Sequence, residues 1–182
     1  TTYCTPFDPK SDESTWIPTP CLMSQYEFSG DRLLMSMPWY IQDYKTRTSV
    51  IKARTISGHF YFTYGKFIQE VPYDPDIYFG GYTEETTLSL RAFTNGYDFY
   101  SPYRMVMWHE YTRKGRKKQW DDDKQWVTKN VNCHKRNRKL FEMDGEVKDI
   151  DFGVYDFCKE RTLDDYERYS GLSFKKRAVQ QY

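Results

Sequence analysis

The chain has 182 residues, with 27 Lys and Arg against 26 Asp and Glu, so its formal net charge is only +1. Aliphatic residues are scarce, but aromatic residues make up 19% of the sequence, and each aromatic side chain can bury roughly 150–250 Å² on folding. This composition predicts one folded domain and excludes a disordered chain, and a membrane-spanning helix is excluded because no run of about 18 apolar residues occurs.

Residues 1–54 are expected to be rich in loops. Five prolines interrupt their short apolar stretches, and each proline fixes its own φ angle and disfavours helix in the residue before it. Extended and turn backbone is therefore expected here, and long helices are not. The prolines are Pro6, Pro9, Pro18, Pro20 and Pro38.

Residues 55–111 are expected to form the core as a strand, a helix and a second extended segment. Residues 55–63 read TISGHFYFT, a β-branched and aromatic run that predicts a buried strand. One or two helical turns are expected after it. A longer helix is predicted from an N-cap at Thr83 to a left-handed cap at Gly96, and residues 97–108 read as extended. This order of elements is typical of α/β or α+β folds.

Residues 112–139 carry 11 Lys and Arg against three Asp, a local charge of +8. Residues 140–182 lack this excess of basic residues and are expected to contain a second helix. Thr162 followed three residues later by Asp165 is an acidic variant of the capping box, and Gly171 offers a C-terminal cap. The second helix is therefore predicted between Thr162 and Gly171.

The cysteines lie far apart and form no CxxC pair, so neither a zinc site nor a dense disulfide framework is predicted. Reduced, mostly buried thiols of an intracellular protein are the favoured interpretation, and a disulfide is the alternative. The N-terminal residues also lack the basic and apolar stretches of a secretory signal. The four cysteines are Cys4, Cys21, Cys133 and Cys158.

Three groups of residues could carry chemistry. The first joins Glu84 and Glu85, which open the predicted helix after a glycine pair, with His109 at the end of an extended segment. Paired carboxylates can act on a hydroxyl group, and a neutral imidazole binds divalent metals well. The alternative is structural, because acidic residues favour the first turn of any helix and a lone His is commonly a hydrogen-bonded structural residue.

The second group, Asp121–Asp123, could bind a metal, but its lysine-rich surroundings favour charge compensation in a solvated loop. The third is the basic and aromatic stretch of residues 111–120, continued by residues 134–139. Such a stretch can bind nucleic acid or the phosphates of a nucleotide sugar. Nucleic acid is disfavoured because the whole chain is nearly neutral and carries no recognisable nucleic-acid motif.

Three blocks of the sequence have an order and spacing that point to one family. They cover most of residues 55–113 and 160–177. The blocks are VPYDPDIYFG at residues 71–80 with Glu84 and Glu85, RAFTNGYDFYSPYRMVMWHEY at residues 91–111, and RTLDDYERYSGLSF at residues 161–174.

In these blocks the chain resembles GT-A-type glycosyltransferases of the GlcNAc-transferase family, whose best-known members are cytoplasmic enzymes that modify a hydroxyproline of a ubiquitin-ligase adaptor. The resemblance implies an α/β fold with a GT-A-like mixed sheet and flanking helices. It also implies UDP-GlcNAc as the sugar donor, a protein or glycan hydroxyl as the acceptor, Mn²⁺ or Mg²⁺ at the diphosphate, and a cytoplasmic location.

Carried onto this sequence, the resemblance assigns catalysis to Glu84 and Glu85 and metal binding to His109. The metal and nearby basic groups would neutralise charge on the departing diphosphate. The implied substrate-binding residues are Gly80, Gly81, Trp108, Arg113 and Lys114.

Two features depart from the family pattern. Tyr82 and Thr83 separate the glycine pair from the acidic pair, which family members usually place directly after the glycine. The donor-binding half, with its Asp-x-Asp or Asp-x-His metal motif, does not occur in the sequence. We therefore expect residues 1–182 to be the C-terminal portion of one transferase domain, completed by an upstream segment or a partner chain and unable to transfer sugar alone.

Two other functions stay open on the sequence. A non-catalytic carbohydrate-binding or structural module could reuse the fold, with its aromatic side chains stacked against sugar rings. A nucleic-acid-binding module could use residues 111–139. The first would bind sugar without needing His109, and the second would show binding that weakens steeply with salt.

Overall fold

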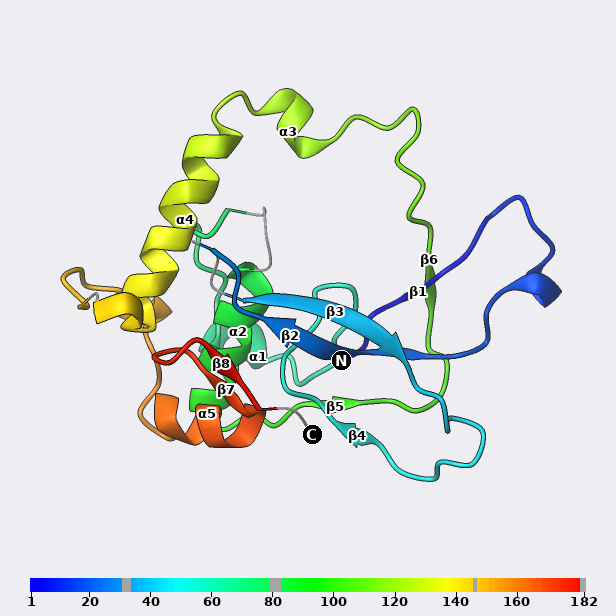
Figure 1. Ribbon diagram of the computed structural model, residues 1–182, viewed down its shortest axis with the longest axis horizontal. Helices are drawn as coiled ribbons and strands as arrows, with labels where there is room; N and C mark the ends of the chain where they lie inside the picture. The colour runs from blue at the N-terminus through cyan, green and yellow to red at the C-terminus, as the bar shows by residue number, and fades with distance from the viewer. Residues whose placement is uncertain (31–33, 79–82, 146, 181–182) are drawn as a thin grey trace.

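The computed structural model of the chain describes residues 1–30, 34–78, 83–145 and 147–180, which form a mixed α/β structure (Figure 1). Its strands are β1 (Thr5–Pro6), β2 (Cys21–Glu27), β3 (Met35–Tyr40), β4 (Ile51–Lys52), β5 (Tyr100–Ser101), β6 (Trp108–His109), β7 (Leu172–Ser173) and β8 (Ala178–Val179). β1 pairs with β6 in parallel, and β2–β3, β4–β5 and β7–β8 are antiparallel. The expected mixed α/β class is confirmed, but the described strands form four separate pairs rather than one mixed sheet.

Five α-helices lie in the described residues. They are α1 (Phe67–Glu70), α2 (Thr83–Thr94), α3 (Gln119–Asp122), α4 (Trp126–Leu140) and α5 (Leu163–Ser170), with 3-10 helices at Glu13–Thr15, Met143–Gly145 and Gly153–Tyr155. α4 and α5 pack against α2, and the chain between β6 and α3 runs as a long extended arc (Figure 1). Among the helices of the described residues, none has the length and apolar character needed to cross a bilayer.

The centre of the fold is α2, which is almost entirely buried although most of its residues are polar. The Thr87 hydroxyl lies 3.0 Å from Asn137 Oδ1 of α4. The Arg91 guanidinium donates to the carbonyls of Pro72 and Val154, at 2.6 and 3.1 Å. Since a buried polar group is costly without a hydrogen bond, α2 fixes the position of each segment that pairs with it.

Aromatic side chains fill the core around α2, as the composition predicts. The Phe93 ring centroid lies 4.6 Å from that of Tyr169, and the Phe141 centroid lies 4.4 Å from that of Phe174. Tyr166 of α5 has no exposed surface. Offset and tilted ring pairs at these distances are favourable, so aromatic packing replaces the scarce aliphatic residues.

The predicted strand over residues 55–63 is wrong, because this range forms turns and irregular backbone. The Ile56 N–H donates to Ser89 Oγ at 2.7 Å, and the Gly58 N–H donates to Glu85 Oε1 at 2.6 Å. Both backbone donors are therefore satisfied by side chains of α2 rather than by a neighbouring strand.

The prediction of loops over residues 1–54 misses the longest strand pair of the described chain, the hairpin of β2 and β3. As the prolines indicate, the described part of this range contains no α-helix. Pro38 nonetheless lies inside β3, opposite Met23, where the register shifts between Met23 and Gln25. A proline cannot donate a hydrogen bond to the strand ladder, so a position beside such an irregularity tolerates it.

Both longer predicted helices are confirmed, and so are their glycine caps. α2 begins at Thr83 itself, so Thr83 lies inside the helix and is not its N-cap. Gly96 has a φ of +89°, the left-handed value expected of a cap. In α5, Thr162 and Asp165 form the predicted capping box, and Gly171 ends the helix with a φ of 68°.

Two shorter predictions are confirmed in part. The one or two helical turns expected after residues 55–63 are α1. Within residues 97–108, only the short strand β5 and the first residue of β6 are strand, and the backbone between them is irregular.

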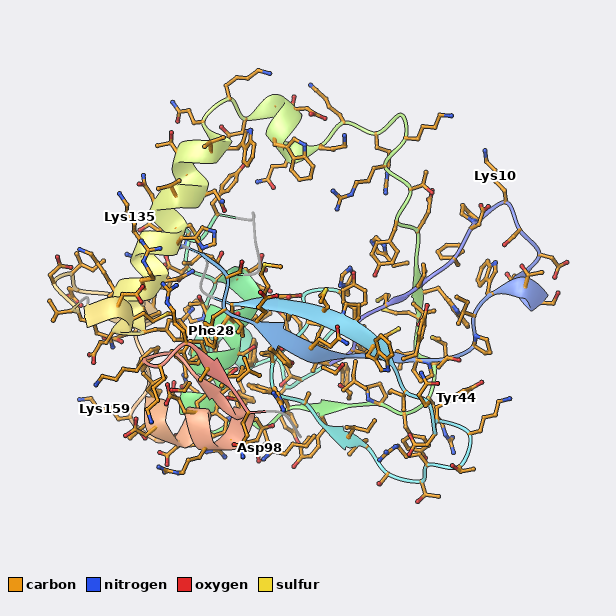
Figure 2. The ribbon with its side chains drawn as sticks, in the orientation of Figure 1. Lys10, Phe28, Tyr44, Asp98, Lys135 and Lys159 are labelled. Carbon is orange, nitrogen blue, oxygen red and sulfur yellow. The ribbon has the colours of Figure 1, made fainter. Side chains whose placement is uncertain are left out.

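The basic segment is more helical than expected, because it contains α3 and most of α4. Asp122 lies in α3 rather than in a loop and forms an ion pair with Lys117. Asp123 forms an ion pair with Lys129 at 2.7 Å. These pairs support the charge-compensation interpretation of the three aspartates. Other basic side chains, such as Lys135, point outward from α4 (Figure 2).

All four cysteines are free thiols in the structure, in agreement with the prediction of reduced, mostly buried thiols. Cys4, Cys21 and Cys133 are buried, and Cys158 is half-buried. Burial raises the pKa of the Cys133 thiol, so this group stays protonated and unreactive at neutral pH.

Ser89→Ala is expected to lower the free energy of unfolding of the native protein by about 1–3 kcal/mol. Ser89 is fully buried, and the Ile56 N–H would lose its acceptor in the variant. Ser49→Ala, the same change at an exposed loop residue, is the control and should cost less than about 0.5 kcal/mol. Urea unfolding measures both variants, and an unchanged stability of Ser89→Ala would contradict this role of α2.

Candidate functional site

Glu84 and Glu85 lie in the first turn of α2, and both are half-buried. Burial raises the pKa of each carboxyl group above its ordinary value. For Glu85, the hydrogen bond from the Gly58 N–H favours the charged form and opposes the effect of burial, while the charge of Glu84 adds to it. Carboxyl groups with a raised pKa are better proton acceptors than exposed ones, and such groups are common at functional sites.

A turn formed by Ser57, Gly58 and His59, here called the 57–59 turn, packs directly against Glu85. A Cβ atom on Gly58 would approach Glu85 Oε1 to 3.3 Å, so the close approach of backbone to carboxylate favours glycine at this position. The Ser57 N–H donates to Thr1 Oγ1 at 2.7 Å and fixes the other end of the turn.

His59 has one imidazole tautomer that fits its hydrogen bonds. Its Nε2 atom lies 3.2 Å from the Tyr111 hydroxyl, which donates its own hydrogen to the Cys4 carbonyl at 2.7 Å. The network therefore assigns the imidazole hydrogen to Nε2 and leaves Nδ1 as an acceptor facing Ser57 Oγ. Burial lowers the pKa of His59, as does the neighbouring His109, so the ring stays neutral near pH 7.

His109 ends β6 beside the 57–59 turn. Its ring centroid lies 5.3 Å from that of His59 and 4.4 Å from that of Tyr111. The residue is exposed, so solutes can reach its imidazole. The structure therefore brings the sequence-predicted residues Glu85 and His109 to the same short turn, where Gly58 contacts one and His59 contacts the other.

Tyr73 extends the site from the acidic pair toward an aromatic surface. Its hydroxyl lies 3.0 Å from the Tyr61 hydroxyl. Burial raises the pKa of Tyr73, and the hydrogen bond to Tyr61 and the charges of Glu84 and Glu85 raise it further.

The described residues do not complete a metal site by themselves. No group of three or more His, Cys, Asp or Glu side chains among them is arranged to hold a metal ion. This finding applies to Asp121–Asp123 and equally to the surroundings of His109. The exposed imidazole of His109 can offer one nitrogen ligand, so the other ligands of such an ion would come from outside the described residues.

Trp108, predicted to bind substrate, makes contacts with the N-terminal loop. Its indole N–H donates to the Ile17 carbonyl at 2.9 Å, and its ring packs edge-on against Trp16 at 5.5 Å. These contacts join β6 to the N-terminal loop and hold the strand on which His109 lies.

Arg113 and Lys114 lie on the exposed arc that leaves β6, a few residues beyond His109. The Arg113 guanidinium lies 5.5 Å from the centroid of the Trp120 ring, a cation–π distance. The arc therefore presents exposed cationic side chains a few residues after His109 in the sequence. Gly80 and Gly81, also predicted to bind substrate, lie outside the described residues.

Sequence reasoning missed the 57–59 turn, Tyr73 and Tyr111 as parts of the site. For the turn, the signal was present, because a glycine inside a strand-like run often marks a close approach of another group to the backbone. Gly58 interrupts the run of residues 55–63 in this way. The two tyrosines carry no such local signal.

Comparison with known proteins gives one family. The family model described as Glycosyltransferase (GlcNAc) matches residues 1–176 of the chain. A search of the curated proteins and a search of the solved structures each find no match.

Gly58→Ala is expected to raise the pKa of Glu85 and to destabilise the native protein by about 1 kcal/mol. The added methyl group would press on the carboxylate and weaken its hydrogen bond from the backbone. Gly65→Ala is the control, because a Cβ atom there meets nothing within 4 Å. An NMR titration of the Glu85 carboxyl group, with urea unfolding, tests the prediction, and an unchanged pKa in Gly58→Ala would count against it.

Proposed function

This chain belongs to the Glycosyltransferase (GlcNAc) family, and we propose that it is the acceptor-side part of an enzyme that, in the intact native protein, transfers GlcNAc from UDP-GlcNAc to a hydroxyl group of a protein or glycan. The observation that carries the proposal is the family match over residues 1–176. The arrangement of Glu84, Glu85 and His109 around the 57–59 turn supports it. A GT-A-type architecture, a likeness to the hydroxyproline-modifying enzymes and a cytoplasmic location belong to the same proposal and rest on the sequence resemblance.

The two carboxylates take different roles in this proposal. Glu85 is committed to the Gly58 N–H at 2.6 Å, so it acts as a positioning residue for the 57–59 turn. Glu84 is half-buried and is the residue that meets the acceptor. Its carboxylate would accept a hydrogen bond from the acceptor hydroxyl, orient that oxygen toward the anomeric carbon of the donor, and take up the proton. The glycosidic bond then forms, the bond from the anomeric carbon to the diphosphate breaks, and UDP leaves with its electron pair.

The cations that follow His109 are suited to the leaving group. Arg113 and Lys114 are exposed, and charge-assisted hydrogen bonds from such side chains to phosphate oxygens are strong. We assign both residues to the diphosphate of the donor. Gly80 and Gly81 keep their substrate-binding assignment from the resemblance, and Trp108 is assigned the support of the strand that ends in His109.

His109 is the proposed protein ligand for Mn²⁺ or Mg²⁺, because it has an exposed imidazole and is followed in the sequence by exposed cationic side chains suited to phosphate. When bound, the ion would supply charge neutralisation at the diphosphate. His109→Ala should weaken Mn²⁺ binding by the native protein by about tenfold or more, measured by electron paramagnetic resonance of free Mn²⁺. Asp122→Asn, a change in the acidic cluster of residues 121–123, is the control and should leave Mn²⁺ binding unchanged. Unchanged Mn²⁺ binding in His109→Ala would show that His109 is not a metal ligand.

Glu84→Gln is expected to lower the turnover of UDP-GlcNAc by the native protein at least about 100-fold, because an amide cannot take up the proton. Release of UDP with water as the acceptor measures this turnover. Since the base must be ionised and burial raises the pKa of Glu84, wild-type turnover should decline on the acid side at a pH above the ordinary carboxyl range. The variant should lack this acid-side decline.

Asp164→Asn is the matched control for this experiment, because Asp164 is an exposed acidic residue in the first turn of another helix, α5. Its turnover should equal that of the wild type. Equal turnover in Glu84→Gln and the wild type would refute the assigned role of Glu84. Binding of UDP-GlcNAc without any turnover would favour the non-catalytic carbohydrate-binding module.

A further inference from the structure

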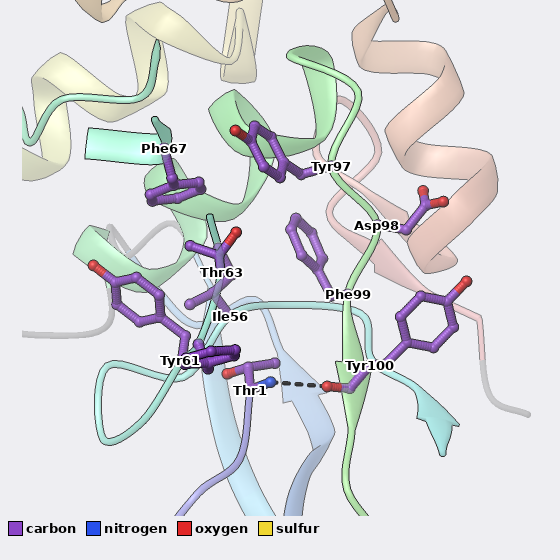
Figure 3. Close-up of a pocket in the computed structure, with 10 residues that line it drawn as sticks. Thr1, Ile56, Tyr61, Thr63, Phe67, Tyr97, Asp98, Phe99 and Tyr100 are labelled. Atoms are coloured by element: carbon purple, nitrogen blue, oxygen red, sulfur yellow. Dashed lines mark hydrogen bonds between the residues drawn. The ribbon is translucent and has the colours of Figure 1, made fainter. Parts of the chain in front are cut away.

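A pocket with an aromatic lining lies between Thr1 at the N-terminus, residues 56–67 and residues 97–100 (Figure 3). Its volume is about 160 Å³. No residue of the acidic pair, the 57–59 turn or β6 lines it. Its lining includes the buried side chains Ile56, Phe67 and Phe99 and the more exposed side chains Tyr61, Phe62 and Tyr97.

The size of the pocket suits one six-membered ring. An engineered protein cavity of about 150 Å³ holds one benzene molecule, so a pocket of 160 Å³ can take one ring. Small-molecule sites of this kind are mainly apolar and carry a few polar groups that fix the orientation of the ligand.

Hydroxyl groups lie at the edge of this apolar surface. The Tyr61 hydroxyl is paired with that of Tyr73 at 3.0 Å, and the Tyr97 hydroxyl donates to Glu70 Oε2. A pyranose ring has C–H groups on its faces and hydroxyl groups around its rim. Aromatic side chains therefore match its faces, and tyrosine hydroxyls match its rim, better than either would match a hydrocarbon.

The 57–59 turn joins the pocket to the acidic pair. Thr1 lines the pocket, and its Oγ1 atom accepts a hydrogen bond from the Ser57 N–H, while the next residue of the turn, Gly58, donates its N–H to Glu85 Oε1 at 2.6 Å. A ring bound in the pocket would therefore lie close to the turn that contacts the acidic pair.

We propose that this pocket binds one pyranose ring of a glycan acceptor and thereby brings a hydroxyl of the neighbouring sugar unit toward Glu84. The inference rests on the proposed function and narrows its acceptor from any hydroxyl to a saccharide. Phe62 supplies an exposed aromatic face to the bound ring, since it is 88% exposed in the free protein and lines the pocket.

Saturation-transfer NMR of N,N′-diacetylchitobiose with the native protein, without UDP-GlcNAc, tests the proposal. Phe62→Ala should weaken the binding of this disaccharide about tenfold. Tyr64→Ala is the matched control, because Tyr64 is 77% exposed on the same loop but does not line the pocket. Its binding should equal that of the wild type, and neither exposed substitution should change the fold.

Three other binding results would overturn the proposal. If the wild type does not bind the disaccharide, or if Phe62→Ala and Tyr64→Ala weaken its binding equally, the pocket does not hold the sugar. Binding of benzyl alcohol but not of the disaccharide would show a hydrophobic site without saccharide recognition. Turnover of UDP-GlcNAc is measured separately in the same protein: saccharide binding without turnover overturns the proposed function alone, and turnover without saccharide binding overturns the pocket alone.

Discussion

The burial of α2 as a polar helix determines where the rest of the candidate site lies. Ser89 accepts a hydrogen bond from the Ile56 N–H, and Glu85 accepts one from the Gly58 N–H. These two hydrogen bonds fix the backbone that precedes His59. A helix of ordinary amphipathic character would bury apolar side chains and leave such loops without partners. Here the buried polar groups of α2 replace the strand neighbours that residues 55–63 lack, so one helix supports both the fold and the site.

The site carries an energetic cost that fits a functional role. The pKa of Glu84 and that of Glu85 are raised by burial in the folded protein. A carboxyl group with a raised folded pKa stabilises the fold at low pH, and this contribution is lost as the pH rises from the unfolded pKa through the folded pKa. At neutral pH both groups therefore weaken the fold, as is common where activity and stability compete.

The features that sequence could predict are those determined by neighbouring residues. The cap at Gly96 and the capping box of Thr162 and Asp165 depend on a few adjacent positions, and both are confirmed. Residues 55–63 look like a strand because their composition suits one, but the acceptors for the N–H groups of Ile56 and Gly58 lie on α2, about 30 residues further along the chain. The helical basic segment escaped prediction because its apolar residues show no clear helical period.

The candidate site was predictable in its residues but not in its connections. Glu84, Glu85 and His109 follow from their spacing and from the family resemblance. The 57–59 turn that links Glu85 to His109, and the Tyr73 contact that leads to the pocket, arise from the packing of segments distant in sequence. Tertiary contacts of this kind leave no local pattern except the glycine that makes room for Glu85.

A crystal structure of the native protein with UDP-GlcNAc and Mn²⁺ would test the central claim most directly. The account predicts that the anomeric carbon of GlcNAc lies beside Glu84 at the start of α2, with the diphosphate and the Mn²⁺ anomalous signal beside His109. A donor bound away from the start of α2, or a metal ion that does not contact His109, would contradict it.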